Sequence, residues 1–151
     1  MKTSFDHITE AYQKEIALHQ ELLECLSRER DHLVDLNLEN LWSLMEEKTR
    51  ILKSIEETRE TIKAHRDEQQ RTQESSSEVR RIVTSFSGKI DRLKGEIRAR
   101  VRENVSFIQD TLGFLDEMIS IFITGAQPAP VYNPVRKGRH ESANLIYHRE
   151  V

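Results

Sequence analysis

The longest regular pattern in the chain runs from Val79 to Phe122, where apolar residues recur at spacings of three, four and four positions. These spacings place the apolar residues on one face of an α-helix, whereas a β-strand would alternate at every second residue. The eleven-residue repeat predicts a nearly straight or slightly right-handed seam. Because so long an amphipathic helix is not stable alone, another element must cover its apolar stripe. The stripe consists of Val79, Ile82, Phe86, Ile90, Leu93, Ile97, Val101, Asn104, Ile108, Leu112, Leu115 and Ile119.

Two shorter amphipathic helices precede this long one. The first begins near Ser4, which can cap a helix, and its apolar stripe continues to Leu33. A tight turn follows within residues 35–39, because Asn37 is a good N-cap and Glu39 interacts favourably with the dipole of a new helix. An unbroken helix through this segment is the alternative. The second helix carries a stripe of Leu38, Leu41, Leu44 or Met45, Leu52, Ile55 and Ile62, which Trp42 and Ile51 widen.

The apolar pattern disappears over residues 63–77, which form either a solvated extension of the second helix or the connection to the third. Ser75 followed by Glu78 fits a capping box, so the third helix is expected to begin at about Ser76. It ends at Thr124, because Gly125 suits a helix C-cap. Local bending or close packing is expected where glycines interrupt the third helix, at Gly88, Gly95 and Gly113.

These elements predict an all-α fold, an elongated antiparallel three-helix bundle or coiled-coil hairpin with a long third helix. The bundle is expected to occupy residues 1–124, with helices at about 4–35, 38–70 and 76–123. Residues 125–151 are predicted to form a flexible tail, because they hold three prolines and a basic patch and show no periodicity. The prolines are Pro128, Pro130 and Pro134, and the basic residues are Arg136, Lys137 and Arg139.

Composition narrows the classes of function. A formal net charge of −3 argues against a strongly basic nucleic-acid binder. The start of the sequence lacks the apolar segment of a secretory signal, and no apolar run is long enough to span a membrane. The single cysteine, Cys25, allows no internal disulfide and suits a reducing cytosol. A cytoplasmic helical protein is therefore expected.

No pattern of catalytic, metal-binding or cofactor-binding residues is found. No two of the six histidines share a helical face at ligand spacing with a carboxylate or thiolate, and no glycine-rich phosphate loop occurs. His19, on the first stripe, is interpreted as a core or edge histidine, and Cys25 as an inert, at least half-buried thiol. We expect no enzyme activity, no metal and no cofactor.

A cluster of basic residues in the third helix has two interpretations. It could follow a phosphate backbone, but acidic residues interrupt it and no aromatic residues alternate with it for base stacking, so a solvated face is favoured. The cluster consists of Arg80, Arg81, Lys89, Arg92, Lys94, Arg98, Arg100 and Arg102. Asn104, the polar member of the long stripe, is either a tolerated edge residue or a buried residue that sets the helix register.

The end of the third helix carries more apolar residues than one face can hold. Between Leu112 and Ile123 they occur nearly all round the helix, so part of this surface is predicted to stay exposed and to bind a partner. The alternative is that the tail or a second copy of the chain covers it. The residues expected to bind the partner are Leu112, Leu115, Met118, Ile119 and Phe122.

Three segments resemble the FlgN-type flagellar export chaperones over roughly Phe5 to Gly138. The segment from Asn37 to Ile55, with its leucine-rich turn and Glu-Glu-Lys run, is similar to the second helix of that family. Asn104 and the apolar residues after it resemble a late segment of the third helix, and Tyr132 followed by Gly138 resembles a tyrosine–glycine element.

The resemblance implies a non-enzymatic cytoplasmic chaperone of flagellar type III secretion. Such a chaperone binds C-terminal amphipathic segments of the hook–filament junction (hook-associated) proteins, prevents their premature assembly and delivers them to the export gate. Tyr132 would dock on the cytoplasmic domain of the export-gate protein, and the end of the third helix would hold the client. A weak homodimer is compatible with this role. The alternative is a homo-oligomeric structural coiled-coil scaffold that buries the long stripe between copies.

Overall fold

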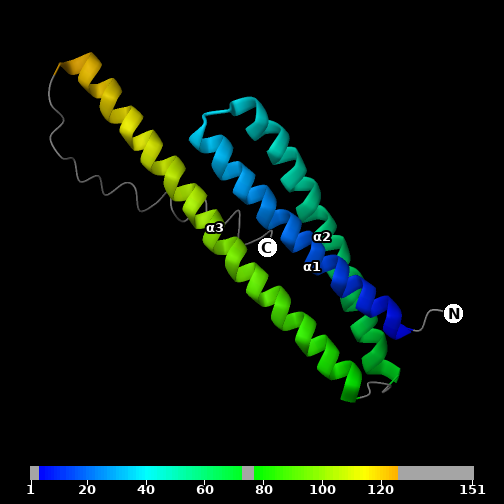
Figure 1. Cartoon of the computed structure of the whole chain (residues 1–151). Coiled ribbons are helices and arrows are strands. Elements are labelled where there is room, and N and C mark those ends of the chain that lie inside the picture. Colours follow the sequence, from blue (N-terminus) through cyan, green and yellow to red (C-terminus); the bar gives the residue numbers. More distant parts are fainter. Residues whose placement is uncertain (1–3, 73–76, 126–151) are drawn as a thin grey trace. The chain divides into compact units, whose positions relative to one another are not determined.

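The computed structural model describes residues 4–72 and 77–125. This part of the chain is folded into three helices without a strand, α1 (Ser4–Val34), α2 (Leu38–Thr72) and α3 (Ser77–Thr124), which confirms the all-α prediction (Figure 1). The helix bounds differ from the predicted ones by at most two residues. The predicted cap Ser75 and the predicted tail beyond Gly125 lie outside the described residues.

The chain divides inside α3 into two compact units. The first, Met1–Arg102, contains α1, α2 and the first part of α3. The second, Glu103–Val151, contains the rest of that helix.

The turn between α1 and α2 satisfies several of the free backbone groups at the ends of both helices. Asn37 donates its backbone N–H to the His32 carbonyl at 2.9 Å, and Leu36 donates to the Leu33 carbonyl at 3.3 Å, a pattern known as a Schellman motif. Leu36 has a φ of 54°, in the left-handed region that glycine usually occupies at this position. The Asn37 Oδ1 then accepts the Asn40 N–H at 3.1 Å, so Asn37 is the N-cap of α2 as predicted. The alternative of one unbroken helix is wrong.

α1 and α2 run antiparallel, as the ion pairs between them show. Lys48, early in α2, pairs with Glu29, late in α1, at 2.6 Å. Arg59, farther along α2, pairs with Glu15, nearer the start of α1, at 3.2 Å. Figure 1 shows these two helices lying side by side. The predicted helical hairpin is therefore present in the first unit.

Two apolar clusters hold the first unit together, and α3 contributes to both. One cluster, near the start of α1, includes Ile90 of α3, which is 4% exposed. The other, near the end of α1, includes Ile97 of α3, which is 1% exposed. The predicted stripe of α3 is thus buried against the hairpin at these two positions. The buried members are Ile8, Ala11, Tyr12, Ile62 and Ile90 in the first cluster, and Leu22, Cys25, Leu26, Leu44, Ile51, Ile55 and Ile97 in the second.

Along α1 and α2, three buried polar residues lie in the sequence between the residues of one apolar cluster and those of the other. Glu15, His19 and Thr58 are each less than 5% exposed. The His19 ring Nδ1 lies 2.7 Å from the Glu15 carbonyl oxygen, and the Thr58 hydroxyl donates to the Ser54 carbonyl at 2.7 Å. The interpretation of His19 as a core histidine is confirmed. Burial lowers the pKa of the His19 imidazole, and this effect exceeds the opposing hydrogen bond to Glu15.

The end of α2 and the glycines of α3 can be compared with the prediction from the sequence. Residues 63–72 continue α2, so this part of the ambiguous segment is a helical extension. A Cβ atom at Gly88 or Gly95 would meet no atom within 4 Å, so close packing does not explain either glycine. Gly125 has a φ of 61° and donates its N–H to the Ile121 carbonyl at 2.9 Å, which confirms it as the C-cap of α3.

Candidate partner-binding surface

The last three turns of α3 expose a continuous set of large apolar side chains, here called the α3-end surface. Leu112 is 55% exposed and Phe122 is 82% exposed. All five residues predicted to bind a partner belong to this set, and each is more than a third exposed. The α3-end surface consists of Leu112, Phe114, Leu115, Met118, Ile119, Ile121, Phe122 and Ile123.

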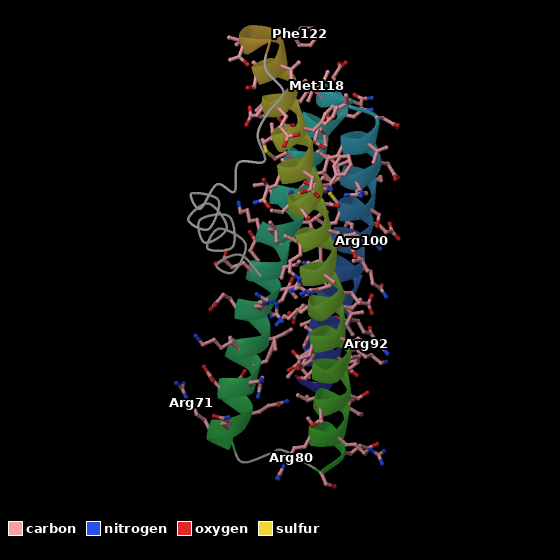
Figure 2. All side chains as sticks on the ribbon, turned by 90° about the vertical axis from the view of Figure 1, so that its left-hand side faces the viewer. Arg71, Arg80, Arg92, Arg100, Met118 and Phe122 are labelled. Carbon is pink, nitrogen blue, oxygen red and sulfur yellow. The ribbon has the colours of Figure 1, made fainter. Side chains whose placement is uncertain are left out.

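The α3-end surface surrounds the helix rather than forming a stripe. Successive residues in an α-helix are about 100° apart, so the consecutive residues Ile121, Phe122 and Ile123 point in three different directions. Figure 2 labels Met118 and Phe122 near the end of α3. The prediction that apolar surface stays exposed here is confirmed.

The charged residues on the same stretch of α3 as the α3-end surface are all acidic. Asp110, Asp116 and Glu117 lie on the same stretch of helix, and no lysine or arginine occurs between Arg102 and Arg136. An apolar surface with acidic neighbours favours a partner that carries both apolar and basic side chains.

A second exposed apolar group, the hairpin-tip surface, lies at the turn between α1 and α2. Its residues are 46% to 71% exposed, and they are Val34, Leu36, Leu38, Trp42 and Met45. The placement of Leu38 on the apolar stripe of the second helix was wrong, because this side chain is 68% exposed. Of the two alternatives given for the next position of that stripe, Leu44 is buried and Met45 is exposed. One signal in the sequence could have revealed this surface: apolar residues crowd a turn, where polar residues are usual.

The described residues include histidines, carboxylates and one thiol, the groups that could bind a metal ion or react. No group of three or more His, Cys, Asp or Glu side chains in residues 4–72 and 77–125 is arranged to hold a metal ion. Cys25 is fully buried, and burial raises the pKa of its thiol. Because the thiolate is the reactive form, this environment suits the predicted inert thiol.

The basic cluster and Asn104 of α3 differ in how far they are buried. Most of the basic cluster is exposed, as a solvated face requires, but Lys94 and Arg100 are half-buried. Figure 2 labels Arg80, Arg92 and Arg100 along the first part of α3. Asn104 is 2% exposed, so the interpretation as an edge residue is wrong and its role in setting register stays a prediction.

A comparison with protein-family models decides the family. The model described as FlgN protein matches residues 1–139. The chain belongs to the FlgN family. FlgN proteins are flagellar export chaperones and are not known as enzymes, so a chaperone function in flagellum biogenesis follows for this chain. Comparisons with curated proteins and with solved structures gave no match.

The FlgN match agrees with the sequence resemblance and extends past the described residues. It includes Tyr132, the predicted docking residue for the export gate, which lies outside the described part of the chain. Among the described helices of this FlgN protein, none is long and apolar enough to cross a membrane.

Proposed function

We propose that this FlgN-family chaperone acts in the cytoplasm and binds hook–filament junction proteins through the α3-end surface. The exposure of this surface carries the proposal, because the described chain leaves eight neighbouring large apolar side chains in contact with water. Monomeric proteins rarely expose such a group without a partner. Binding would cover an apolar surface of the client, so that an unassembled client could not associate prematurely through it.

The partner that fits best is the C-terminal amphipathic segment of the client. A segment that is disordered when free can fold as a helix against Leu115, Ile119 and their neighbours. Complete burial of one such side chain contributes about 1.5–3 kcal/mol, and the cost of ordering the segment offsets part of the total. Basic residues beside the apolar face of the client would complement Asp110, Asp116 and Glu117.

Delivery of the client is proposed to use a different part of the chain. Tyr132 is the residue that the family resemblance assigns to the cytoplasmic domain of the export-gate protein. Tyr132→Ala should therefore weaken gate docking and leave client affinity unchanged. An unchanged gate affinity would remove Tyr132 from this step.

Paired acidic substitutions test the client surface. Leu115→Asp or Ile119→Asp should abolish binding of the client segment, because each places a charge in the centre of the apolar contact. Met45→Asp on the hairpin-tip surface is a matched control, since Met45 is 46% exposed and Leu115 is 48% exposed. The control should bind the client normally. Circular dichroism should show that all three variants keep their helix content.

The test also separates the chaperone from the scaffold alternative. If Leu115→Asp binds the client with normal affinity, the client surface lies elsewhere. If instead the unmodified chain is a tight oligomer that ignores the client and Leu115→Asp makes it monomeric, the α3-end surface serves self-association.

A further inference from the structure

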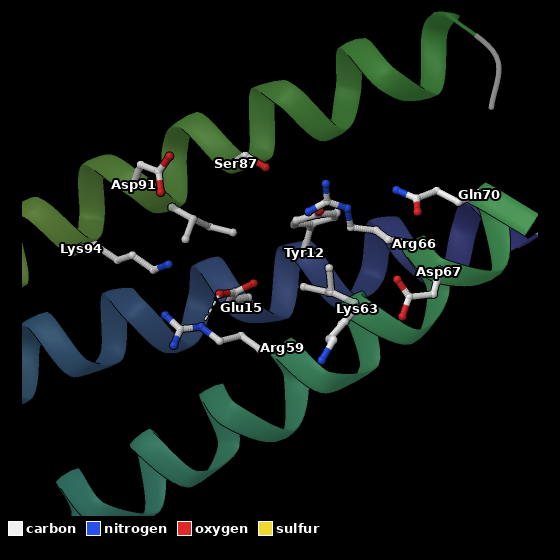
Figure 3. Close-up of a pocket in the computed structure, with 12 residues that line it drawn as sticks. Tyr12, Glu15, Arg59, Lys63, Arg66, Asp67, Gln70, Ser87, Asp91 and Lys94 are labelled. Carbon is white, nitrogen blue, oxygen red and sulfur yellow. Dashed lines mark hydrogen bonds and ion pairs between the residues drawn. The ribbon is translucent and has the colours of Figure 1, made fainter. Parts of the chain in front are cut away.

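A cleft in the first unit is lined by residues of α1, α2 and the first part of α3. Its volume is about 440 Å³, within the range typical of small-molecule sites. Figure 3 shows side chains from α1, α2 and the first part of α3 around it. Its lining includes Tyr12, Glu15, Arg59, Lys63, Arg66, Asp67, Gln70, Ser87, Asp91 and Lys94.

Tyr12 places a hydroxyl group at this cleft without a hydrogen-bond partner. The residue is 3% exposed, and its ring stacks on Phe86 with 5.5 Å between ring centres. The Tyr12 hydroxyl makes no hydrogen bond to any described residue. A buried donor that stays unsatisfied is destabilising, and such groups are rare in native proteins. A bound molecule with an acceptor oxygen would satisfy it.

Positive charge surrounds the same space. Arg59 is neutralised by Glu15, to which its Nε donates at 3.2 Å. Lys63, Arg66 and Lys94 form no ion pair with any described residue. Lys94 is also partly desolvated, and this burial, together with the nearby Arg59, lowers the pKa of its ammonium group. An anion in the cleft would relieve the repulsion between these cations.

Two carboxylates oppose the binding of an anion. Asp67 and Asp91 also line the cleft, and both residues are exposed to water. Water screens exposed charges more strongly than half-buried ones, so the half-buried Lys94 and the buried Tyr12 hydroxyl should dominate. The two carboxylates provide a test of the sign of the ligand's charge, because removal of either carboxylate should strengthen the binding of an anion.

We propose that this cleft binds a small polyanion with two or more phosphate or carboxylate groups. Tyr12 donates a hydrogen bond to one group, and Lys94 and Arg66 contact others from two different helices. The volume exceeds what a single phosphate group fills, which favours a ligand with several charged groups. The site is independent of the proposed client surface, because it lies wholly among residues of the first unit.

Titration calorimetry of the full chain at low salt tests the site, with pyrophosphate, tripolyphosphate and citrate as probes. Lys94→Gln should weaken binding roughly tenfold, because it removes a charge-assisted contact from a half-buried position. Arg66→Gln should weaken binding by a smaller factor, because Arg66 is exposed and water screens its charge. Tyr12→Phe should weaken binding severalfold while keeping the ring and the net charge. Asp91→Asn should strengthen binding. A preference for pyrophosphate over citrate would identify a phosphate site, and the reverse preference a carboxylate site.

Arg92→Gln is the matched control for Lys94→Gln. Arg92 is exposed on the same helix two residues away and does not line the cleft, and the two substitutions change the net charge equally. The control should bind all probes like the unmodified chain. The proposal is overturned if no probe binds at millimolar concentration, or if Arg92→Gln weakens binding as much as Lys94→Gln. Circular dichroism identifies any variant that fails to fold, and Tyr12→Phe and Asp91→Asn then decide the result.

Discussion

Arg59→Ala should destabilise the chain far more than a typical loss of an ion pair. The Glu15 side chain is 5% exposed, and Arg59 is the ion-pair partner that reaches it from α2 at 3.2 Å. Removing one partner of a buried pair costs about 3–5 kcal/mol, because the other charge stays buried without compensation. Arg59 itself is 31% exposed, so water can partly replace it. We therefore expect a loss of about 2–3 kcal/mol.

Arg28→Ala provides the comparison. Arg28 and Glu47 form a shorter ion pair, at 2.6 Å, but their side chains are 47% and 28% exposed. Exposed pairs contribute only about 0–1 kcal/mol, so this variant should lose less than Arg59→Ala despite the shorter distance. The double variant Glu15→Met with Arg59→Met should recover most of the stability, because it removes both buried charges and keeps apolar volume.

Urea unfolding followed by circular dichroism measures all of these free energies. Arg59→Ala should lose much stability, Arg28→Ala should lose little, and the double variant should recover most of the loss. Equal losses for the two single arginine variants would refute this expectation, because burial would then have no influence on the cost. If the double variant were as unstable as Arg59→Ala, the buried charge of Glu15 would not be the cause of the lost free energy of unfolding.

Two further substitutions test the helix interiors. Gly95→Ala should stabilise the chain by about 0.5–1 kcal/mol, because glycine weakens a helix and a Cβ at this site would meet no neighbouring atom; an unchanged or lower urea midpoint would contradict this. His19→Gln should reduce the loss of stability on acidification. The lowered pKa of His19 means that the unfolded chain takes up a proton first, so stability is lost as pH falls below about 6.5 toward the folded-state pKa. Glu15, Arg59 and Lys94 face this imidazole electrostatically, and equal losses between pH 7 and 5.5 in both proteins would exclude His19 as a source of that dependence.

Helical periodicity was sufficient to predict the elements and much of the core. Ile90 and Ile97 are buried where the stripe of the third helix placed them, and Asn37 caps α2 as its residue type suggested. These features depend on local geometry, which repeats with the sequence. The excess of apolar residues after Leu112 also predicted exposure correctly, because one helix face cannot hold them all.

Features that depend on how the helices pack could not be predicted from periodicity. Leu38 fits the stripe of α2, yet its side chain is exposed, and periodicity did not decide between Leu44, which is buried, and Met45, which is exposed. Lys94 belonged to a basic cluster interpreted as a solvated face, yet it is half-buried at a cleft. Tyr12 is buried in the core, and its unsatisfied hydroxyl became visible only when three helices were in place. The rotation of each helix about its own axis determines which of these side chains are buried. The repeat of apolar positions in the sequence defines that rotation only approximately.

Binding of a client to the α3-end surface of this FlgN protein can be measured directly. Light scattering on a sizing column, with and without the C-terminal segment of the same organism's hook–filament junction protein, tests it most directly. The account predicts a chain that gains the mass of one segment per chain, and a Leu115→Asp variant that gains none. A stable multimer whose mass does not change with the segment would contradict the account, because self-association would then satisfy the exposed apolar surface.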